Sequence, residues 1–312
     1  MDASLKPLSM IYNQQSGFHA SQNDEIYEQL ITLWSDAGYE IQVFDLSNTP
    51  DLAVLMQRIL QRHHQYVDLG VIVAAGGDGT LNAVAAHLLG QNIPLGILPL
   101  GTFNYVARVL EIPLDLLEAA KVIVSGQVRA SHVGRINDQI YLNNACFGLY
   151  PLFIQKREWY NQHFGRFTLH AYTSALDVLI RDRKELSIEI EIDQQRYPVN
   201  TPLLFFGNNQ LQLEQLRLHI AQSAAQGEVA GVLLARADQA TIFKTLLQLI
   251  RGNLEHAEHV HSFSGQQVCI YSKKSQMTVA IDGELVKIKM PIHIRVEQNA
   301  LNIQVPYAAP FV

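Results

Sequence analysis

Apolar runs of strand length alternate with amphipathic helical segments along roughly the first 125 residues. The strand-like runs span residues 8–13, 39–46, 70–75 and 94–98. Helices are predicted between them, from Ser21 to Gly38, from Pro50 through about His64 and over residues 80–89. In the second of these, Thr49 is the predicted cap, Pro50 the first helical residue and Asp51 an acid of the first turn. Apolar strands separated by helices are typical of a parallel sheet that is buried on both faces. The pattern predicts a three-layer α/β domain over residues 1–128.

Short segments with strand-like alternation dominate the chain from about residue 129. They span residues 185–192, 196–206, 229–235, 267–272, 277–281, 284–289 and 292–296, with two helices predicted at 170–181 and 239–251. Asp282-Gly283 separates two of these segments, and this dipeptide is a strong signal for a two-residue β-hairpin turn. The pattern predicts an antiparallel, β-rich second domain over residues 129–300, with the last ten or so residues returning to the first domain.

Length and charge narrow the class of protein. A chain of 312 residues exceeds the size at which one hydrophobic core stops growing, so two domains are expected. The 23 basic and 29 acidic residues give a net charge of −6, whereas proteins that grip nucleic acid over a broad surface carry the opposite sign. Nucleic acid is therefore not expected as a partner. A local basic patch can still act on a membrane surface within a Debye length of about 8 Å.

Compartment is indicated by the cysteines and by the lack of long apolar runs. The two cysteines, Cys146 and Cys269, lie in apolar stretches, as expected for buried thiols in a reducing compartment. No signal-peptide pattern is seen at residues 1–13, and no run approaches the ~20 apolar residues that cross a bilayer. A cytoplasmic protein is predicted. The basic and aromatic residues of segment 156–167 leave peripheral contact with the inner membrane face open.

The most informative segment is a glycine-rich turn between an apolar strand and a helix. Its residues are Gly76, Gly77, Asp78, Gly79, Thr80 and, two positions later, Asn82. Glycines let backbone N–H groups approach a ligand closely, and a helix N-terminus offers unpaired donors with a partial positive charge. These features favour phosphate oxygens. Because the acid Asp78 would repel phosphate unless a cation intervenes, it indicates Mg²⁺.

Two more polar loops follow neighbouring strands. The loop after the fourth strand contains Gly101, Thr102 and Asn104, and the loop after the first strand contains Asn13, Ser16 and Gly17. The side chains of Thr102 and Asn104 are expected to donate to phosphate or ribose, as a second wall of the nucleotide site opened by the glycine-rich turn. No Gly-x-x-x-x-Gly-Lys-Ser/Thr pattern and no protein-kinase signature occurs in the chain.

These motifs together resemble the diacylglycerol kinase catalytic-domain superfamily, which includes bacterial lipid kinases and sphingosine kinases. The resemblance rests most on residues 76–80, 101–104 and 282–284, with support from 105–108, 142–150 and 206–209. It implies an ATP-binding domain related to the folds of NAD kinase and phosphofructokinase, followed by a β-sandwich. It also implies transfer of the γ-phosphoryl group of Mg-ATP to a lipid hydroxyl in an interdomain cleft, with diacylglycerol as the default acceptor.

The same resemblance implies the catalytic residues. Glu284 matches the proton acceptor of the family, Asp282 belongs to the same turn, and Asp78 would arrange Mg²⁺. A carboxylate close to the hydroxyl proton typically contributes about 10²–10⁴-fold to such a reaction. The lipid would be reached at the membrane surface from the water side. A homodimer is left open, because no interface signature stands out.

The chain departs from the family pattern in three places. Gln14-Gln15 stands where a proline often follows the asparagine, and segments 210–214 and 226–228 lack the glycine run and Asp-Gly pair that help relatives to hold an auxiliary Mg²⁺. That auxiliary site is not carried over. Two alternatives remain. One is an NAD kinase, which shares the glycine-rich turn, and the other is a non-catalytic nucleotide-binding regulatory protein.

Overall fold

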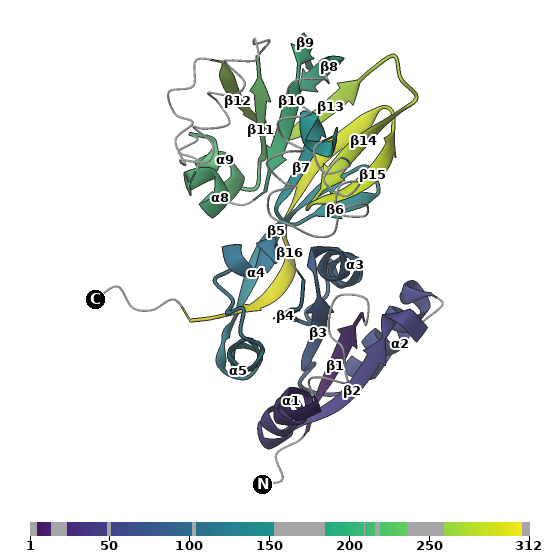
Figure 1. Ribbon diagram of the computed structural model, residues 1–312, viewed down its shortest axis with the longest axis vertical. Helices are drawn as coiled ribbons and strands as arrows, with labels where there is room; N and C mark the ends of the chain where they lie inside the picture. Colours follow the sequence, from purple (N-terminus) through teal and green to yellow (C-terminus); the bar gives the residue numbers. More distant parts are fainter. Residues whose placement is uncertain are drawn as a thin grey trace, which may run out of the picture. The chain divides into compact units, whose positions relative to one another are not determined.

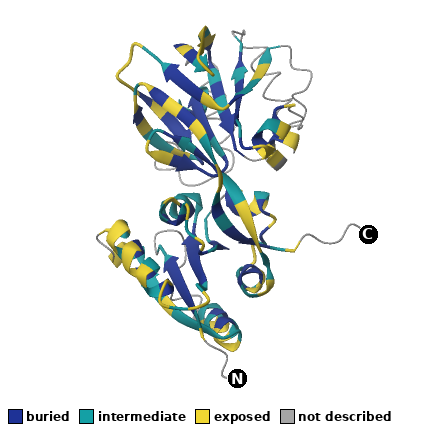
Figure 2. Ribbon diagram, turned by 180° about the vertical axis from the view of Figure 1, so that it is seen from behind, coloured by how far each residue is buried: buried dark blue, intermediate teal, exposed yellow. Residues whose placement is uncertain are grey.

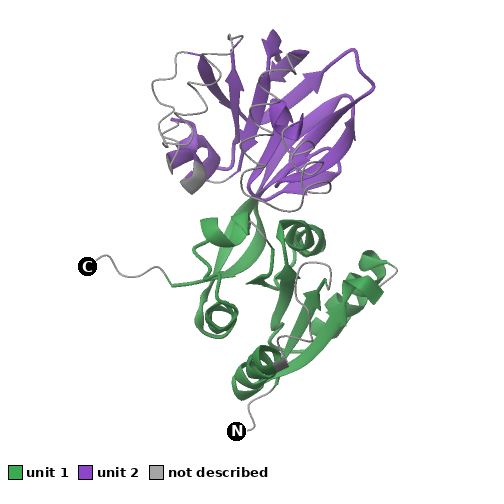
Figure 3. Ribbon diagram, in the orientation of Figure 1, with its two compact units in different colours: residues 1–132, 298–312 green, residues 133–297 purple. Residues whose placement is uncertain are grey.

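The computed structural model describes residues 5–13, 24–48, 51–101, 104–152, 185–208, 210–215, 219–235 and 259–307. The chain forms two compact units, shown in Figure 3: unit 1 contains residues 1–132 and 298–312, and unit 2 contains residues 133–297. Among the described residues, no helix is long and apolar enough to span a bilayer.

Unit 1 is built on a parallel sheet with the strand order β2-β1-β3-β4. Its strands are β1 (Lys6–Tyr12), β2 (Tyr39–Asp45), β3 (Val71–Gly76) and β4 (Leu95–Pro99). Every residue of β3 and β4 is buried, which explains why these two segments show no polar alternation in the sequence. The end of β16 (Ile292–Val305) lies parallel beside β4, with Ile303 opposite Leu95.

Helices cover both faces of this sheet. They are α1 (Asp24–Asp36), α2 (Leu52–His63), α3 (Asp78–Leu88), the short α4 (Tyr105–Val109) and α5 (Leu116–Ser125), with a 3₁₀ turn, η3, at Leu46–Asn48. α1 and α5 pack together, and Trp34 Nε1 donates to Ala120 O across them (3.3 Å). The connection from β1 to β2 runs in one direction across the sheet, and the connections from β2 to β3 and from β3 to β4 run in the other. Because such crossovers are right-handed, α1 covers one face of the sheet, and α2 and α3 cover the opposite face (Figure 1). The predicted three-layer α/β domain is confirmed.

The start of α2 differs from the prediction. The sequence suggested Thr49 as the cap and Asp51 as an acid within the first turn. In the structure Asp51 itself is the N-cap, and its carboxylate accepts a hydrogen bond from Ala53 N (2.8 Å) and a longer one from Val54 N (3.4 Å). Thr49 and Pro50 lie outside the described residues. An aspartate accepts hydrogen bonds from the first N–H groups of a helix at least as well as a threonine does. Asp51, which directly precedes α2, therefore caps the helix.

Unit 2 contains two antiparallel layers. One is the sheet β12-β11-β10-β7-β14-β15, and the other is formed by β16, β13, β8 and β9, with the β5–β6 hairpin beside β16. The strands are β5 (Gln127–Ile136), β6 (Gln139–Tyr141), β7 (Asn144–Gly148), β8 (Leu186–Ile192), β9 (Gln195–Thr201), β10 (Leu203–Gly207), β11 (Val229–Leu234), β12 (Val260–Gly265), β13 (Gln267–Tyr271), β14 (Gln276–Ile281) and β15 (Glu284–Lys289). Two short helices, α8 (Gln210–Gln215) and α9 (Ala221–Ala225), lie between β10 and β11 in the chain. The predicted antiparallel β-rich class is confirmed.

The core of unit 2 lies between these layers. Phe147 and Phe206 are fully buried there and meet edge to face, with ring centroids 6.0 Å apart. Aliphatic residues of β8, β13 and β16 complete the core from the other layer, as the dark blue strands of Figure 2 show. Alternation along β8 follows this arrangement, because Leu186, Ile188 and Ile190 are buried while the residues between them are exposed.

Two predicted strands differ from the observed ones. Residues 196–206 were expected to form one strand but form two, β9 and β10, which belong to different sheets. Pro202 lies at the break, where it cannot donate a ladder hydrogen bond, and Leu203 N donates to the Thr201 hydroxyl instead (3.1 Å). The predicted strand 292–296 continues to Val305 as β16. The predicted helices at 170–181 and 239–251 lie outside the described residues.

Candidate functional site

The topology of unit 1 places a ligand site at one edge of its sheet. The chain leaves β1 toward β2 on one side and returns to β3 on the other, so the strand order reverses between β1 and β3. Ligands of doubly wound sheets bind outside the carboxyl ends of the strands at this point. Asn13 follows the end of β1, and the glycine-rich turn follows the end of β3. Ser16 and Gly17, predicted for the same loop as Asn13, lie outside the described residues.

Two glycine turns pack directly against each other at this edge. Leu100 N donates to Gly76 O (3.0 Å), which joins the turn after β4 to the turn after β3. A Cβ atom placed on Gly101 would lie 2.5 Å from Gly77 Cα, closer than real Cβ contacts allow. A Cβ atom on Gly76 would lie 2.6 Å from the Thr80 side chain. The glycines are therefore required by close packing, which brings two backbone segments together.

The glycine-rich turn leads into α3 without a side-chain cap. Gly77 is the N-cap residue and makes no side-chain hydrogen bond to the helix. The predicted residues Asp78, Gly79, Thr80 and Asn82 all lie within the first five positions of α3. An uncapped start of an eleven-residue helix presents N–H donors and the positive end of the helix dipole. This end of α3 can bind phosphate oxygens.

Asp78 connects the two turns through its carboxylate. Its Oδ1 accepts a hydrogen bond from Val106 N (3.0 Å), and its Oδ2 accepts one from Tyr105 N (3.1 Å), at the start of α4. Burial raises the pKa of Asp78, and these backbone hydrogen bonds offset only part of that effect. The fold thus holds a carboxylate whose charge is partly desolvated, a feature frequent at functional sites. The sequence predicted a metal ligand here but not this structural role.

Asn104 shapes the second turn from within. It adopts a left-handed backbone conformation, with φ of 50°, and is 8% exposed. Its Oδ1 accepts from Gly101 N (2.8 Å), and its Nδ2 donates to Gly101 O (2.9 Å) and Pro99 O (3.3 Å). Both N–H groups of the amide are used inside the turn, so the predicted donation to phosphate or ribose by this side chain does not fit. Thr102 lies outside the described residues.

The predicted residues of unit 2 lie on the β14–β15 hairpin. Asp282 and Gly283 form the predicted two-residue turn, with φ values of 45° and 90° and with Ile281 paired to Glu284. Asp282 is 4% exposed, and its carboxylate accepts three backbone hydrogen bonds, from Leu142 N (2.7 Å), Asn143 N (2.9 Å) and Asn144 N (2.8 Å). Glu284 is exposed at the first position of β15. Asp282 therefore anchors the turn, whereas Glu284 is open to solvent.

Asn143 is a candidate that the sequence analysis did not single out. It is 2% exposed, and its Nδ2 has no hydrogen-bond partner within the described part of the chain. Its backbone is held on both sides, because its N–H donates to Asp282 and its carbonyl accepts from Asn208 N (2.8 Å). A buried unpaired donor costs about 1–3 kcal/mol. The segment 142–144 supported the family resemblance, but no residue type or spacing in it indicated a free donor.

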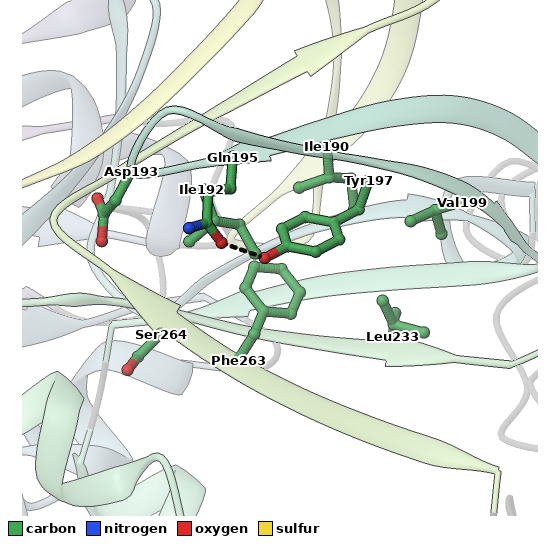
Figure 4. A pocket seen from close by; sticks show the side chains of 9 residues that line it. All are labelled: Ile190, Ile192, Asp193, Gln195, Tyr197, Val199, Leu233, Phe263 and Ser264. Atoms are coloured by element: carbon green, nitrogen blue, oxygen red, sulfur yellow. Dashed lines mark hydrogen bonds between the residues drawn. The ribbon is translucent and has the colours of Figure 1, made fainter.

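A cavity of about 570 Å³ opens between the two layers of unit 2. Figure 4 shows apolar side chains from β8, β9, β11 and β12 lining it: Ile190, Ile192, Val199, Leu233 and Phe263. Its polar groups are Asp193, Ser264, Gln195 and Tyr197, of which the Tyr197 hydroxyl donates to Gln195 Oε1 (2.6 Å). The volume falls in the range of about 300–1,000 Å³ seen for small-molecule pockets. The lining suits an apolar ligand.

The described residues do not build a metal cage of their own. Within the described part of the chain, no three His, Cys, Asp or Glu side chains lie close enough to hold an ion together. Mg²⁺ usually keeps several waters and binds through one or two carboxylates together with substrate phosphates. Asp78 fits the role of such a single carboxylate, because each of its oxygens has a second lone pair beyond the backbone hydrogen bond it accepts.

Comparison with known proteins points to one family. Residues 7–136 match the family model described as Diacylglycerol kinase catalytic domain. A protein named diacylglycerol kinase from Staphylococcus haemolyticus (strain JCSC1435) is 28% identical over 279 residues, which cover 88% of this chain and 81% of that protein. Another of the same name, from Staphylococcus saprophyticus, is 27% identical over 284 residues, covering 89% of each.

Solved structures show the same fold. A crystal structure of a diacylglycerol kinase from Bacillus anthracis str. Sterne matches with a TM-score of 0.71 at 18% identity, covering 98% of this chain and 99% of that chain. A second structure from the same organism matches with a TM-score of 0.72, also at 18% identity, covering 98% and 99%. At this identity the likeness concerns the fold, and it confirms the fold class predicted from the sequence.

Proposed function

The chain belongs to the diacylglycerol kinase catalytic domain family, and from this premise we propose that it is an ATP-dependent kinase that phosphorylates a hydroxyl group of a lipid. Diacylglycerol is the acceptor that the names of its relatives favour. The observation that carries the proposal is the pair of packed glycine turns at the switch point of the unit 1 sheet.

The nucleotide would bind to unit 1 through backbone groups. The uncapped start of α3 supplies N–H donors for phosphate oxygens, and the contact between Gly77 and Gly101 keeps side chains out of the cradle. Asp78 would help to hold Mg²⁺, which neutralises phosphate charge when bound. By joining α3 to α4, the same carboxylate fixes the distance between the two turns. Nucleotide binding and the local fold thus depend on one residue.

The acceptor is assigned to unit 2. The apolar cavity between β8, β9, β11 and β12 suits the hydrocarbon part of a lipid. A dinucleotide such as NAD is largely polar and would make few favourable contacts with its apolar lining. Glu284 is the candidate base because it is exposed at the start of β15, on a turn that Asp282 anchors by three hydrogen bonds. A carboxylate at about 2.6–3.2 Å from the acceptor oxygen would take the hydroxyl proton as the new bond forms.

A second candidate is a non-catalytic protein that binds a nucleotide. The observation that favours it is that two of the predicted catalytic acids are engaged in the fold: the carboxylates of Asp78 and Asp282 accept hydrogen bonds from backbone N–H groups. In that case both acids would serve the fold alone. The exposed Glu284 is the feature that separates the two proposals, because its place at the first position of β15 leaves its side chain accessible to solvent.

The test is ADP release by the purified protein with Mg-ATP. Mixed micelles would carry diacylglycerol or other lipid alcohols, and a parallel reaction would contain NAD in place of lipid. We expect lipid-dependent turnover that falls at least about a hundredfold in Glu284→Gln. The matched control is Glu189→Gln, which changes an exposed carboxylate on β8 of the same unit and should leave turnover within about twofold of wild type.

Each other outcome points elsewhere. Full activity of the Glu284→Gln variant would remove the residue from the reaction. Formation of NADP would identify an NAD kinase. Binding of ATP without turnover on any acceptor would favour the non-catalytic protein.

A further inference from the structure

Lysines are concentrated on the β14–β15 hairpin of unit 2 and on the loop that precedes it. The chain has nine lysines, and four of them lie within residues 273–289: Lys273, Lys274, Lys287 and Lys289. All four are exposed. Lys273 and Lys274 lie in the loop between β13 and β14, which extends away from the two sheets in Figure 1, and the other two lie on β15. These four residues are called the lysine edge below.

The lysine edge is continuous across the hairpin. In the β14–β15 ladder, Lys289 lies opposite Gln276 and Lys287 lies opposite Thr278. Lys274 is only two residues from Gln276, and Met290 N donates to Ser275 O (3.0 Å), which closes the loop onto the end of β15. Lys287 and Lys289 point to the same face of β15, because residues two apart on a strand share a face. The four lysines therefore lie in the half of the hairpin away from its turn and in the loop that precedes it.

The lysine edge carries more positive than negative charge. Among the described residues, none of these four lysines lies within ion-pair distance of a carboxylate, whereas Lys6 pairs with Asp68 (3.0 Å) and Lys121 pairs with Glu118 (2.6 Å). The acids within residues 273–289 are Asp282, which is buried against backbone N–H groups, and Glu284. Although the chain has a net charge of −6, residues 273–289 thus present four exposed lysines against one exposed acid.

We propose that the lysine edge binds the anionic surface of a phospholipid bilayer. A cluster of lysines attracts anionic headgroups, and each one near the surface strengthens binding about fivefold at physiological salt. Four lysines together would contribute up to several hundredfold. The surface chemistry fits a bilayer because the cluster is spread over an open loop and a strand edge, where the charges can face a plane of headgroups.

Binding through the lysine edge would bring the candidate base close to its lipid acceptor, and this step rests on the proposed function. Glu284 begins the strand that carries Lys287, three residues away, which corresponds to about 10 Å along a β-strand. A protein held on the bilayer by this strand would keep its candidate base on the same strand, about 10 Å from the nearest docked lysine. The hydroxyl of a lipid acceptor lies at the level of the headgroups. Docking would therefore raise the local concentration of the acceptor.

Lysines at a sheet edge also have a simpler use. β15 is the last strand of its sheet in the described part of the chain, and charged side chains on such a strand block pairing with a second molecule. That use accounts for Lys287 and Lys289. It does not account for Lys273 and Lys274, which lie in the loop outside the ladder.

The test is sedimentation of the full chain with vesicles of phosphatidylglycerol and phosphatidylcholine, or of phosphatidylcholine alone, at about 50 and 150 mM salt. We expect binding to the anionic vesicles only, weaker at the higher salt. Lys287→Gln with Lys289→Gln should lower the partition constant roughly 10- to 30-fold, and the fourfold variant by about 10²-fold or more. The matched control is Lys6→Gln with Lys121→Gln, which removes the same charge from paired lysines and should change binding less than about threefold.

Three results would overturn the proposal: no binding of wild type to anionic vesicles, equal losses in the control and the hairpin variant, or unchanged binding with self-association of the fourfold variant. The last would show edge protection alone. An unchanged unfolding temperature shows that each variant folds. Turnover of wild type in neutral micelles tests the kinase separately, so vesicle binding without turnover would leave the surface in place and remove the proposed function.

Discussion

Replacing Asp282 with asparagine tests whether its carboxylate holds the fold of unit 2 or acts in the reaction. The substitution is nearly isosteric, and asparagine accepts the left-handed backbone that Asp282 adopts at φ of 45°. Asn-Gly is also a favoured two-residue hairpin turn. The backbone preference of the turn is thus retained. The change acts on the hydrogen bonds to segment 142–144.

The magnitude follows from the three bonds. The amide oxygen of the new side chain can keep the bonds from Asn143 N and Asn144 N, which both reach Oδ1, but its NH₂ group would face Leu142 N. One buried donor is left unpaired, at a cost of about 1–3 kcal/mol, and the two remaining bonds lose about 1 kcal/mol each without the charge. Relief from burying a charge offsets part of this. We expect a loss of about 2–4 kcal/mol in the free energy of unfolding of unit 2.

Asp193 offers a matched control in the same unit. It also has a positive φ, 46°, and its Oδ1 alone accepts the bonds from Gln266 N (3.0 Å) and Gln267 N (3.1 Å). An amide oxygen can accept both, so Asp193→Asn should cost less than about 1 kcal/mol. Urea unfolding followed by circular dichroism gives the free energies, and hydrogen exchange of the Leu142, Asn143 and Asn144 amides reports the local effect. Wild-type stability in Asp282→Asn together with lost turnover would refute the anchoring role and favour a chemical one.

Two further predictions concern unit 1. Burial lowers the pKa of His63 to about 4, so the fold disfavours the charged form of this side chain. The stabilisation is full above pH 6.5 and is lost as the pH falls toward 4, by about 3 kcal/mol in total. Urea midpoints measured across this pH range should show the loss for wild type but not for His63→Gln. An equal pH dependence in both would contradict this. The Cβ of Gly101→Ala would lie 2.5 Å from Gly77 Cα, so this variant should lose about 1–3 kcal/mol of stability and bind ATP more weakly. The Cβ of Gly77→Ala meets Gly101 Cα at 3.4 Å, so this variant should lose less of both. Calorimetric titration with ATP checks this, and tighter binding by Gly101→Ala than by Gly77→Ala would contradict it.

Features that depend on neighbouring residues were predicted well. The apolar run at 70–75 became β3 within a residue at each end, and Asp282-Gly283 became a hairpin turn with Ile281 opposite Glu284. Both follow from local chemistry, since periodic burial and positive φ are encoded in a few adjacent side chains. The break at Pro202 was missed, although proline signals it, because the flanking residues on each side alternate like one strand.

The partners of the polar side chains were not predictable. Asp78 was expected to hold a metal ion, but its carboxylate also accepts hydrogen bonds from residues 27 and 28 positions away. Asn104 was expected to donate to a ligand, yet it satisfies its own turn. A side chain of this kind can bond to any donor or acceptor that the fold brings near. Residue type therefore indicates that a bond forms, but not with which partner.

The sequence by itself determined the two kinds of sheet, the glycine turns after β3 and β4 and the hairpin at Asp282, because burial period and backbone freedom act over a few residues. Only the tertiary structure decided that the Asp282 carboxylate anchors a segment some 140 residues earlier in the chain and that the side-chain Nδ2 of Asn143 finds no hydrogen-bond partner among the described residues. The lysine edge was visible as composition but became a surface only through the pairing of β14 with β15. Long-range hydrogen bonds and surface charge depend on how strands pair, and the residues that pair lie far apart in the chain.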